Sequence, residues 1–272
     1  MRPRPDDIII ASCYKSGTTL TQQIVKLLVR GPVDLGHMAA LSPWVESRLH
    51  SPGAAAVEAL PSPRFLKTHL PFEALPYRPE WRYIALARDG RDVCVSLYEH
   101  CRALRAERPR VAGRPPVDDG AEDLPTFWRD WLATGRPRWD FFSHVDSWWR
   151  VRQLDNVLLL HYADFLTDKI AQAKMIADFI GVGWTSEIEA LIDDASSLAQ
   201  MKRLERAGKV GGRRPKSVAT FINKGTNGRW EALLPPEEVA RYLQAAQERL
   251  DPACSAWLQS GGPLPEETGG QR

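Results

Sequence analysis

The residues best suited to chemistry stand near the start of the chain, in the stretch Ser12-Cys13-Tyr14-Lys15-Ser16-Gly17-Thr18-Thr19-Leu20. The apolar run before it, residues 8–11, suits a buried strand, and residues 21–28 have the apolar spacing of a helix. The turn would therefore lie at a helix N-terminus, where unpaired N–H groups and the helix dipole attract an anion. With the charge of Lys15 and the hydroxyls of Ser16, Thr18 and Thr19, the stretch predicts a loop that binds phosphate or sulfate.

Two other interpretations of this loop have to be weighed. Ser and Thr also cap helices, and glycine also makes turns, so an ordinary capping turn is one alternative. A nucleotide kinase or NTPase is the other, because its P-loop also joins a strand to a helix. The P-loop pattern places its lysine after the last glycine, whereas Lys15 precedes Gly17. This order disfavours the kinase.

Polar residues also follow three further predicted strands. Residues 64–69 end in Lys67, Thr68 and His69, residues 81–88 end in Arg88, and residues 156–162 end in His161 and Tyr162. Helical patterns over residues 91–98, 167–180, 185–194 and 235–250 separate or follow these strands. Such alternation predicts an α/β fold with a central parallel sheet flanked by helices. Ligands bind at the carboxyl ends of such strands, so we expect these side chains to converge on one site.

Length and composition limit the class of protein. The chain has 272 residues, is 43% hydrophobic and carries a formal net charge of +2. We expect one domain over residues 1–272 and no nucleic-acid partner, since a uniformly basic surface is absent. Four cysteines without regular spacing and the lack of a long apolar run predict a protein of the cytoplasm without a transmembrane segment. Mobile loops are expected near residues 104–125 and 208–220, and a flexible tail near 259–272.

From the loop onward, the chain resembles the cytosolic-type sulfotransferases, which use 3′-phosphoadenosine 5′-phosphosulfate. Lys15-Ser16-Gly17-Thr18-Thr19 matches their 5′-phosphosulfate loop, Lys67-Thr68-His69-Leu70-Pro71 the segment of their catalytic histidine, and Arg88 with Ser96 their 3′-phosphate signature. Later matches are Trp148-Trp149, Tyr162-Ala163-Asp164 and Lys224-Gly225-x-x-Gly228-x-Trp230. The matches follow the family order over nearly the whole chain.

The resemblance implies a role for each matched residue in sulfuryl transfer. His69 would be the base, Lys15 would neutralise the leaving phosphate, and Lys67 would hold sulfuryl or phosphate oxygens. Ser96 is placed with these catalytic residues and also with Arg88, Lys224 and Gly225 around the 3′-phosphate. Tyr162 and Ser197 would contact the adenosine. No metal site is expected, since no acidic cluster has ligand spacing.

Four positions differ from the family pattern inside the implied cofactor site. Tyr14 replaces the usual proline of the loop, Leu20 a tryptophan that commonly stacks on adenine, Leu198 a frequent aromatic residue, and Asn223 the arginine before Lys224. We therefore expect weaker binding of the cofactor, with function retained. A nucleotide-binding module without catalysis is a further alternative, against which the intact Lys15 and His69 argue.

The acceptor is less clearly marked. An aromatic-rich segment, residues 124–149, predicts either an apolar pocket for a small, hydrophobic or aromatic hydroxyl compound or ordinary core packing. A short helix is expected over residues 43–50, with Trp44 contributing to the same pocket. An amine acceptor is less favoured, and the oligomeric state is left open.

Overall fold

The computed structural model describes residues 2–47, 53–107, 123–211 and 221–265. Four strands form its sheet: β1 (Ile8–Ser12), β2 (Phe65–Thr68), β3 (Arg82–Ala87) and β4 (Val157–His161). Two short 3₁₀ helices, η1 (Phe72–Ala74) and η2 (Arg229–Ala232), accompany the α-helices. The α-helices are α1 (Thr18–Arg30), α2 (Met38–Leu41), α3 (Ala54–Glu58), α4 (Gly90–Glu107), α5 (Leu124–Thr134), α6 (Phe141–Arg150), α7 (Tyr162–Thr167), α8 (Lys169–Ile180), α9 (Ser186–Ala195), α10 (Leu198–Arg206), α11 (Pro236–Arg249) and α12 (Pro252–Ser260).

The four strands run parallel in the order β2-β1-β3-β4. In register, Ile10 of β1 lies between Lys67 of β2 and Ile84 of β3. Because all strands point the same way, the residues that follow them meet at one edge of the sheet. The predicted α/β fold with a central parallel sheet is confirmed.

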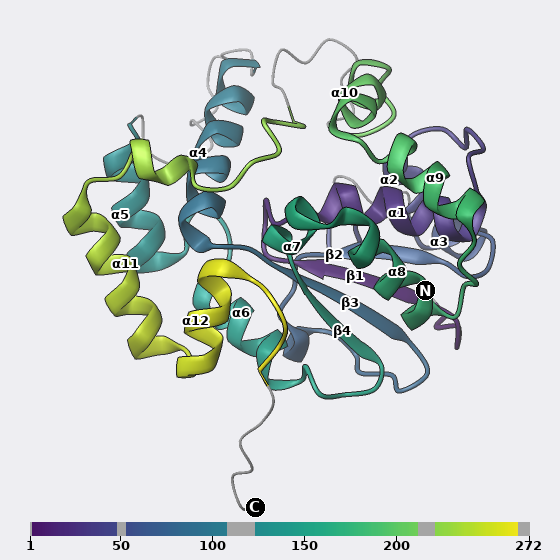
Figure 1. Cartoon of the computed structure of the whole chain (residues 1–272), viewed down its shortest axis with the longest axis horizontal. Coiled ribbons are helices and arrows are strands. Elements are labelled where there is room, and N and C mark those ends of the chain that lie inside the picture. Colours follow the sequence, from purple (N-terminus) through teal and green to yellow (C-terminus); the bar gives the residue numbers. More distant parts are fainter. Residues whose placement is uncertain (1, 48–52, 108–122, 212–220, 266–272) are drawn as a thin grey trace, which may run out of the picture.

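Helices cover both faces of the sheet, as β1 requires. Its side chains alternate between two hydrophobic clusters: Ile8 and Ile10 face one, and Ile9 and Ala11 face the other. Helices α1 and α8 pack in the first cluster, whereas α4, α5, α6, α11 and α12 pack in the second (Figure 1). A strand buried on both faces explains the continuous apolar run in the sequence.

The aromatic-rich segment forms core and not pocket. Its aromatic side chains are buried in the second cluster, apart from Trp139, which is 44% exposed. Trp128 donates its indole N–H to Glu238, and Trp148 donates to the carbonyl of Leu70. Of the expected two roles for residues 124–149, core packing is the one the structure supports.

The predicted helix over residues 43–50 is wrong for the part that the structure describes. Trp44 instead forms a parallel bridge with Lys67, and residues 45–46 turn. The backbone N–H of Val45 donates to the Lys67 carbonyl, and the Lys67 N–H donates to the Pro43 carbonyl. A proline at the start and an unsatisfied strand edge nearby favour this extended pairing.

The expected mobile segments fall largely outside the described residues, which leave out 108–122, 212–220 and 266–272. Where described, their borders differ from expectation. Helix α4 continues to Glu107, and Val210 is buried beside helix α1 and helix α8 residues in one cluster. Gly262 is tied to Asp164 by its N–H and to Trp257 by its carbonyl. A search of the described helices for a membrane-crossing span finds no candidate.

Candidate active site at the carboxyl edge of the sheet

A cavity of about 890 Å³ opens where the strands end. Every matched motif residue that was assigned to catalysis or cofactor binding lines it, apart from Ser16. Among the described residues, its walls contain no aspartate or glutamate, but they contain seven cationic side chains: Lys15, Lys67, Arg88, Arg138, Lys169, Lys224 and Arg229. Such a one-sided distribution of charge suits a multiply charged anion.

The loop between β1 and α1 is built to leave backbone donors free. Lys15 and Gly17 both have left-handed backbone angles, with φ of 64° and 102°. Gly17 precedes α1, and no side chain caps that helix end. A Cβ on Gly17 would lie 2.7 Å from the Tyr162 ring. Glycine therefore permits both the turn and the close approach of Tyr162, and the helix start stays open toward an anion.

Ser16 is buried and does not lie where an anion-binding hydroxyl was expected. Its hydroxyl donates to the Tyr14 carbonyl at 3.4 Å, and its residue is not part of the cavity wall. Thr18 lies on the wall but shares a 2.5 Å hydrogen bond with the Ser12 hydroxyl. Of the three loop hydroxyls, only that of Thr19 has no hydrogen bond to another described residue. The backbone N–H groups and Lys15 are therefore the main groups that this loop offers to an anion, and its hydroxyls contribute less.

Two lysines are held in the cavity without a carboxylate on its walls. Burial, followed by repulsion from Arg88 and Lys67, lowers the pKa of Lys15 to about 8. Burial likewise lowers the pKa of Lys67 to about 8, although Glu46 opposes the shift. The Lys15 ammonium lies 4.4 Å from the centre of the Phe221 ring, and that of Lys67 lies 4.9 Å from the Trp44 ring. Aromatic faces therefore support both cations, leaving them available to an anion.

His69 is buried and held as a neutral base. Its Nδ1 lies 2.8 Å from the Ser12 carbonyl oxygen, which can only accept, so Nδ1 carries the proton. The lone pair is then on Nε2. Burial, followed by repulsion from Lys67, holds the pKa of His69 well below its usual 6.5. An unprotonated imidazole with a fixed tautomer can accept a proton from a hydroxyl.

Aromatic rings fix the His69 imidazole in place. The Tyr14 ring stacks on it at 4.2 Å between centroids, and the Trp44 ring meets it edge-on at 5.0 Å. Glu46 accepts from the backbone N–H of His69 and from the Thr68 hydroxyl. Tyr14, which stands where the family has proline, therefore becomes part of the wall around the base.

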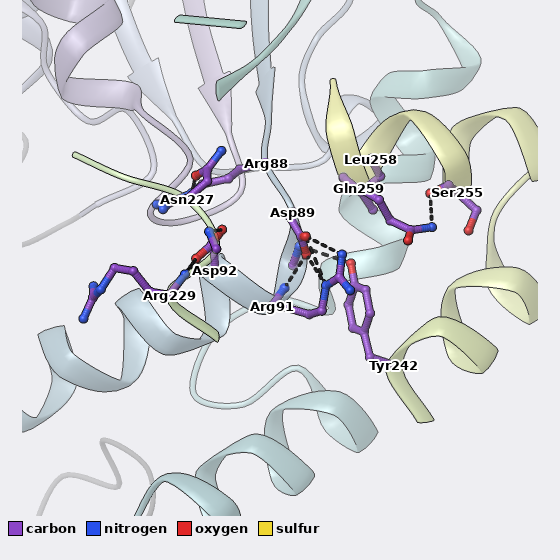
Figure 2. Close-up of polar contacts among 12 residues, drawn as sticks. Arg88, Asp89, Arg91, Asp92, Asn227, Arg229, Tyr242, Ser255, Leu258 and Gln259 are labelled. Carbon is purple, nitrogen blue, oxygen red and sulfur yellow. Dashed lines mark hydrogen bonds and ion pairs between the residues drawn. The ribbon is translucent and has the colours of Figure 1, made fainter. Parts of the chain in front are cut away.

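Arg88 ties two loops together. Its guanidinium donates to the carbonyls of Lys15 and Thr226 and to the side-chain oxygen of Asn227, and it lies 4.6 Å from the Tyr162 ring centre. Figure 2 shows the contact with Asn227. Among the described residues, neither neighbouring aspartate forms an ion pair with Arg88. Asp89 pairs with Arg91, and Asp92 accepts from the backbone N–H groups of Gly228 and Arg229 (Figure 2).

The second half of the expected 3′-phosphate site lies beside α4. Ser96 is on the cavity wall, Lys224 is exposed toward solvent, and Gly225 has a positive φ of 65°. Asn223 is occupied, because its amide donates to Glu99 at 2.5 Å. Arg229 forms an ion pair with the same carboxylate. The site is thus assembled from α4 and residues 223–229.

The expected adenosine contacts come from three elements. Tyr162 begins α7, and Ser197 caps α10 by accepting from the Gln200 N–H. Leu198 is 42% exposed on the cavity wall, and a Cβ on Gly225 would lie 3.2 Å from it. Leu20, on α1, also lines the wall. Leu20 and Leu198 therefore line the cavity at the two positions where the resemblance led us to expect aromatic residues.

The lining residues that were not anticipated from the sequence include His100, Arg138, Phe221 and Arg229. His100 is one helical turn beyond Ser96, so the helical period alone could have indicated it. Burial, followed by repulsion from Lys15, lowers the pKa of His100 to about 3, which keeps it neutral. Arg138 lies in the connection between α5 and α6, 5.3 Å from the Tyr14 ring centre. Nothing in its sequence neighbourhood indicated this position.

Metal ligands are not gathered at this site. No group of three or more His, Cys, Asp or Glu side chains suited to a metal ion occurs among the described residues. Any anion bound here would be met by lysine, arginine and backbone donors.

The family model described as "Sulfotransferase domain" matches residues 5–253. The chain is 28% identical to a glycolipid sulfotransferase of Mycobacterium bovis over 95% of this chain and 89% of that protein. It is 30% identical to rabbit (Oryctolagus cuniculus) sulfotransferase 1C2 over 84% and 77% of the two chains.

Solved structures have the same fold. Mouse sulfotransferase SULT7A1, complexed with PAP, matches with a TM-score of 0.75 and 22% identity over 95% of this chain and 89% of that one. Retinol dehydratase in complex with androsterone and PAP matches with a TM-score of 0.76 and 24% identity, over 93% and 82%. The resemblance that the motifs indicated is confirmed.

Proposed function

The chain belongs to the sulfotransferase family, and we propose that it transfers a sulfuryl group from 3′-phosphoadenosine 5′-phosphosulfate to the hydroxyl of a small acceptor. One observation carries the assignment of residues. A neutral, tautomerically fixed His69 lies in the same cavity as Lys15, Lys67 and an open helix N-terminus. The site therefore combines a base, cations and hydrogen-bond donors for an anion, as sulfuryl transfer requires.

The cavity suits the donor in charge and in size. A nucleotide with a 3′-phosphate and a 5′-phosphosulfate carries several negative charges, and seven cations without a carboxylate line the described walls. We place the 5′ end at Lys15, Gly17, Thr18 and Thr19, and the 3′-phosphate at Arg88, Ser96, Lys224 and Gly225. Leu20, Tyr162, Ser197, Leu198 and Asn223 would border the adenosine and ribose. The structural relatives named above bind PAP, which supports this choice of nucleotide.

The chemistry assigned to the chain is a balanced transfer. His69 Nε2 takes the proton of the acceptor hydroxyl, whose oxygen forms the new bond to sulfur. The bond between sulfur and the 5′-phosphate oxygen breaks, and its electron pair remains on the phosphate. Lys15 neutralises that oxygen. Lys67 and Ser96, which both line the cavity, stabilise the charge on the sulfuryl oxygens during transfer. Positioning and electrostatics therefore account for catalysis.

For the acceptor, we infer a small molecule that presents a hydroxyl to His69 against aromatic rings. Tyr14 and Trp44 contribute to this wall, and their rings suit a hydrophobic or aromatic compound. Relatives act on or bind compounds of this kind, as the names glycolipid sulfotransferase and retinol dehydratase indicate. We also place the protein in the cytoplasm, since none of its four buried cysteines forms a disulfide bond.

The test uses radiolabelled donor with a panel of phenols, sterols, glycolipids and retinoids. We expect label on at least one hydroxyl compound, and binding of adenosine 3′,5′-bisphosphate without magnesium. Nucleotide binding that requires magnesium would instead favour a kinase. Magnesium-free binding with no transfer to any member of the panel would favour a module without catalysis.

A further inference from the structure

We propose that Arg229 is a recognition residue for the 3′-phosphate of the nucleotide, supplying the guanidinium that position 223 lacks. This inference rests on the proposed function, because it assumes that the cavity binds a 3′-phosphorylated nucleotide. Nothing in the motif comparison assigned Arg229 a role. Its position in the cavity wall does.

The side chains of Asn223 and Arg229 meet at one carboxylate. The Asn223 amide donates to Glu99 Oε2 at 2.5 Å, and Arg229 Nη1 donates to the same oxygen at 2.9 Å. Arg229 Nη2 pairs with the other oxygen, so the guanidinium fork is fully oriented by Glu99. The two side-chain ends are therefore neighbours, and a charge at position 229 reaches the space next to position 223.

Arg88 cannot meet a doubly charged phosphate by itself. It already donates to the carbonyls of Lys15 and Thr226 and to Asn227, contacts that involve all three of its nitrogens. The Lys224 side chain is exposed and is a flexible point charge. A second guanidinium held in a fixed direction would add positive charge and its remaining N–H donors beside the phosphate.

The backbone also holds Arg229 in place. Asp92, on the first turn of α4, accepts from the N–H groups of Gly228 at 2.8 Å and of Arg229 at 3.1 Å (Figure 2). Gly228 has a positive φ of 77°, which turns the chain toward η2. Since Ser96 and Glu99 lie on the same helix as Asp92, α4 fixes Arg229 relative to the phosphate site at both its main chain and its side chain.

Glu99 acts here as a positioning residue with an opposing charge. Its carboxylate orients Arg229, and ion pairing with Arg229 lowers the pKa of Glu99 despite partial burial. The same negative charge lies next to the phosphate site. Replacement by glutamine keeps a hydrogen-bonding partner but removes the repulsion, so it should not weaken phosphate binding. A purely structural ion pair would respond in the opposite way.

The experiment measures binding of adenosine 3′,5′-bisphosphate and of AMP, which lacks the 3′-phosphate, by calorimetry on the full chain. Arg229→Ala should weaken the bisphosphate by about tenfold or more and leave AMP within about twofold, the difference expected for a lost charge-assisted contact. Glu99→Gln should bind the bisphosphate at least as tightly as the parent. Adding Asn223→Arg to Arg229→Ala should restore the preference for the bisphosphate.

Arg249→Ala is the matched control. Arg249 forms a partly exposed ion pair with Asp140 and does not line the cavity, so its loss should leave both affinities unchanged. A parent that binds both nucleotides equally would refute the proposed function itself. A parent that discriminates, with Arg229→Ala discriminating equally well, would refute only the role of Arg229. Equal losses for both nucleotides in Arg229→Ala and Glu99→Gln would make the pair structural and also overturn the inference.

Discussion

The two ends of the central sheet hold buried charge in opposite ways. At the amino end, Asp7 precedes β1 and Arg64 precedes β2, and their side chains form a completely buried ion pair. Arg64 Nε lies 2.7 Å from Asp7, and the guanidinium also donates to the carbonyls of Arg2 and Val57. At the carboxyl end, Lys15 and Lys67 face a cavity whose described walls carry no carboxylate.

The difference separates charge that serves the fold from charge that serves a ligand. Desolvation makes any buried ion unfavourable, and a partner with good geometry offsets that cost at the amino end. At the carboxyl end no carboxylate on the described cavity wall offsets the desolvation of Lys15 and Lys67. The pKa values of both lysines therefore fall to about 8. An anionic ligand would complete the second arrangement, as Asp7 completes the first.

The largest expected effect comes from breaking the completed pair. Arg64→Met leaves the buried Asp7 carboxylate with the backbone N–H of Arg4 but without its cationic partner, so we expect the free energy of unfolding to fall by about 3–5 kcal/mol. Chemical denaturation measures this change. Turnover per folded molecule should be preserved. The exposed pair of Arg150 with Asp146 offers a control, since Arg150→Met should change stability by less than about 1 kcal/mol. Similar losses of stability in both variants would contradict the expected difference between a buried ion pair and an ion pair at the surface.

The next effect is on catalysis at the opposite end. His69→Ala should lower turnover by about 10² or more, the scale of a lost general base, with nucleotide affinity nearly intact. Because the pKa of His69 lies well below 6.5, the acidic limb of kcat/KM in the parent should also fall below pH 6.5. Steady-state kinetics across pH test both points. Turnover near the parent rate in the alanine variant would remove His69 from the mechanism.

A smaller effect sharpens the comparison directly. Lys67→Met removes a desolvated cation for which the described cavity wall provides no carboxylate partner. The free energy of unfolding should therefore stay constant or rise, the reverse of the effect of Arg64→Met. The affinity for adenosine 3′,5′-bisphosphate should fall by about tenfold, as for a lost charge-assisted contact. Denaturation and calorimetry on the same preparation give both values. A destabilised variant with unchanged affinity would place Lys67 among the structural charges.

The smallest expected effect is a pH dependence of nucleotide binding. With pKa values of about 8 in the free protein, Lys15 and Lys67 lose protons as the pH rises past 8, whereas a bound anion would favour their charged forms. Affinity should therefore be highest near pH 7 and decrease severalfold by about pH 8.5. Binding should be accompanied by proton uptake near pH 8, which calorimetry in two buffers detects. Affinity that stays constant from pH 7 to 9 would contradict these lysine pKa values.

Local pattern was enough to predict the sheet and the convergence of most candidate site residues on one cavity. A strand buried on both faces is a continuous apolar run, as at residues 8–11, and parallel strands bring Lys15, Lys67, His69 and Arg88 to one edge. The aromatic-rich segment could not be assigned in this way. Burial in a core and lining of a pocket both require apolar side chains, and only the packing of helices α5 and α6 against β3 and α11 decides between them.

Residues from irregular connections could not be predicted either. Arg138 belongs to a segment without a helical or strand period, and Glu46 to a segment that was wrongly predicted as a helix, so their distance from His69 depends on how distant loops pack. The shared use of Glu99 by Asn223 and Arg229 joins positions more than a hundred residues apart along the chain. The loop Lys15–Leu20 was recognisable because strand, turn and helix are contiguous there.

The bridge between Trp44 and Lys67 affects which substitutions the protein can accept without exposing a strand edge to aggregation. Strand β2 is an edge of the sheet, and such an edge would readily accept a strand from another molecule. The backbone of residues 43–45 occupies the outward N–H and carbonyl of Lys67, and Glu46 occupies the N–H of His69. Because main-chain groups make the first two bonds, the side chain at position 44 can vary while the edge stays covered. Under the proposed function, a substitution at Trp44 would therefore change the acceptor wall and the packing around His69 while the edge of the sheet stays covered.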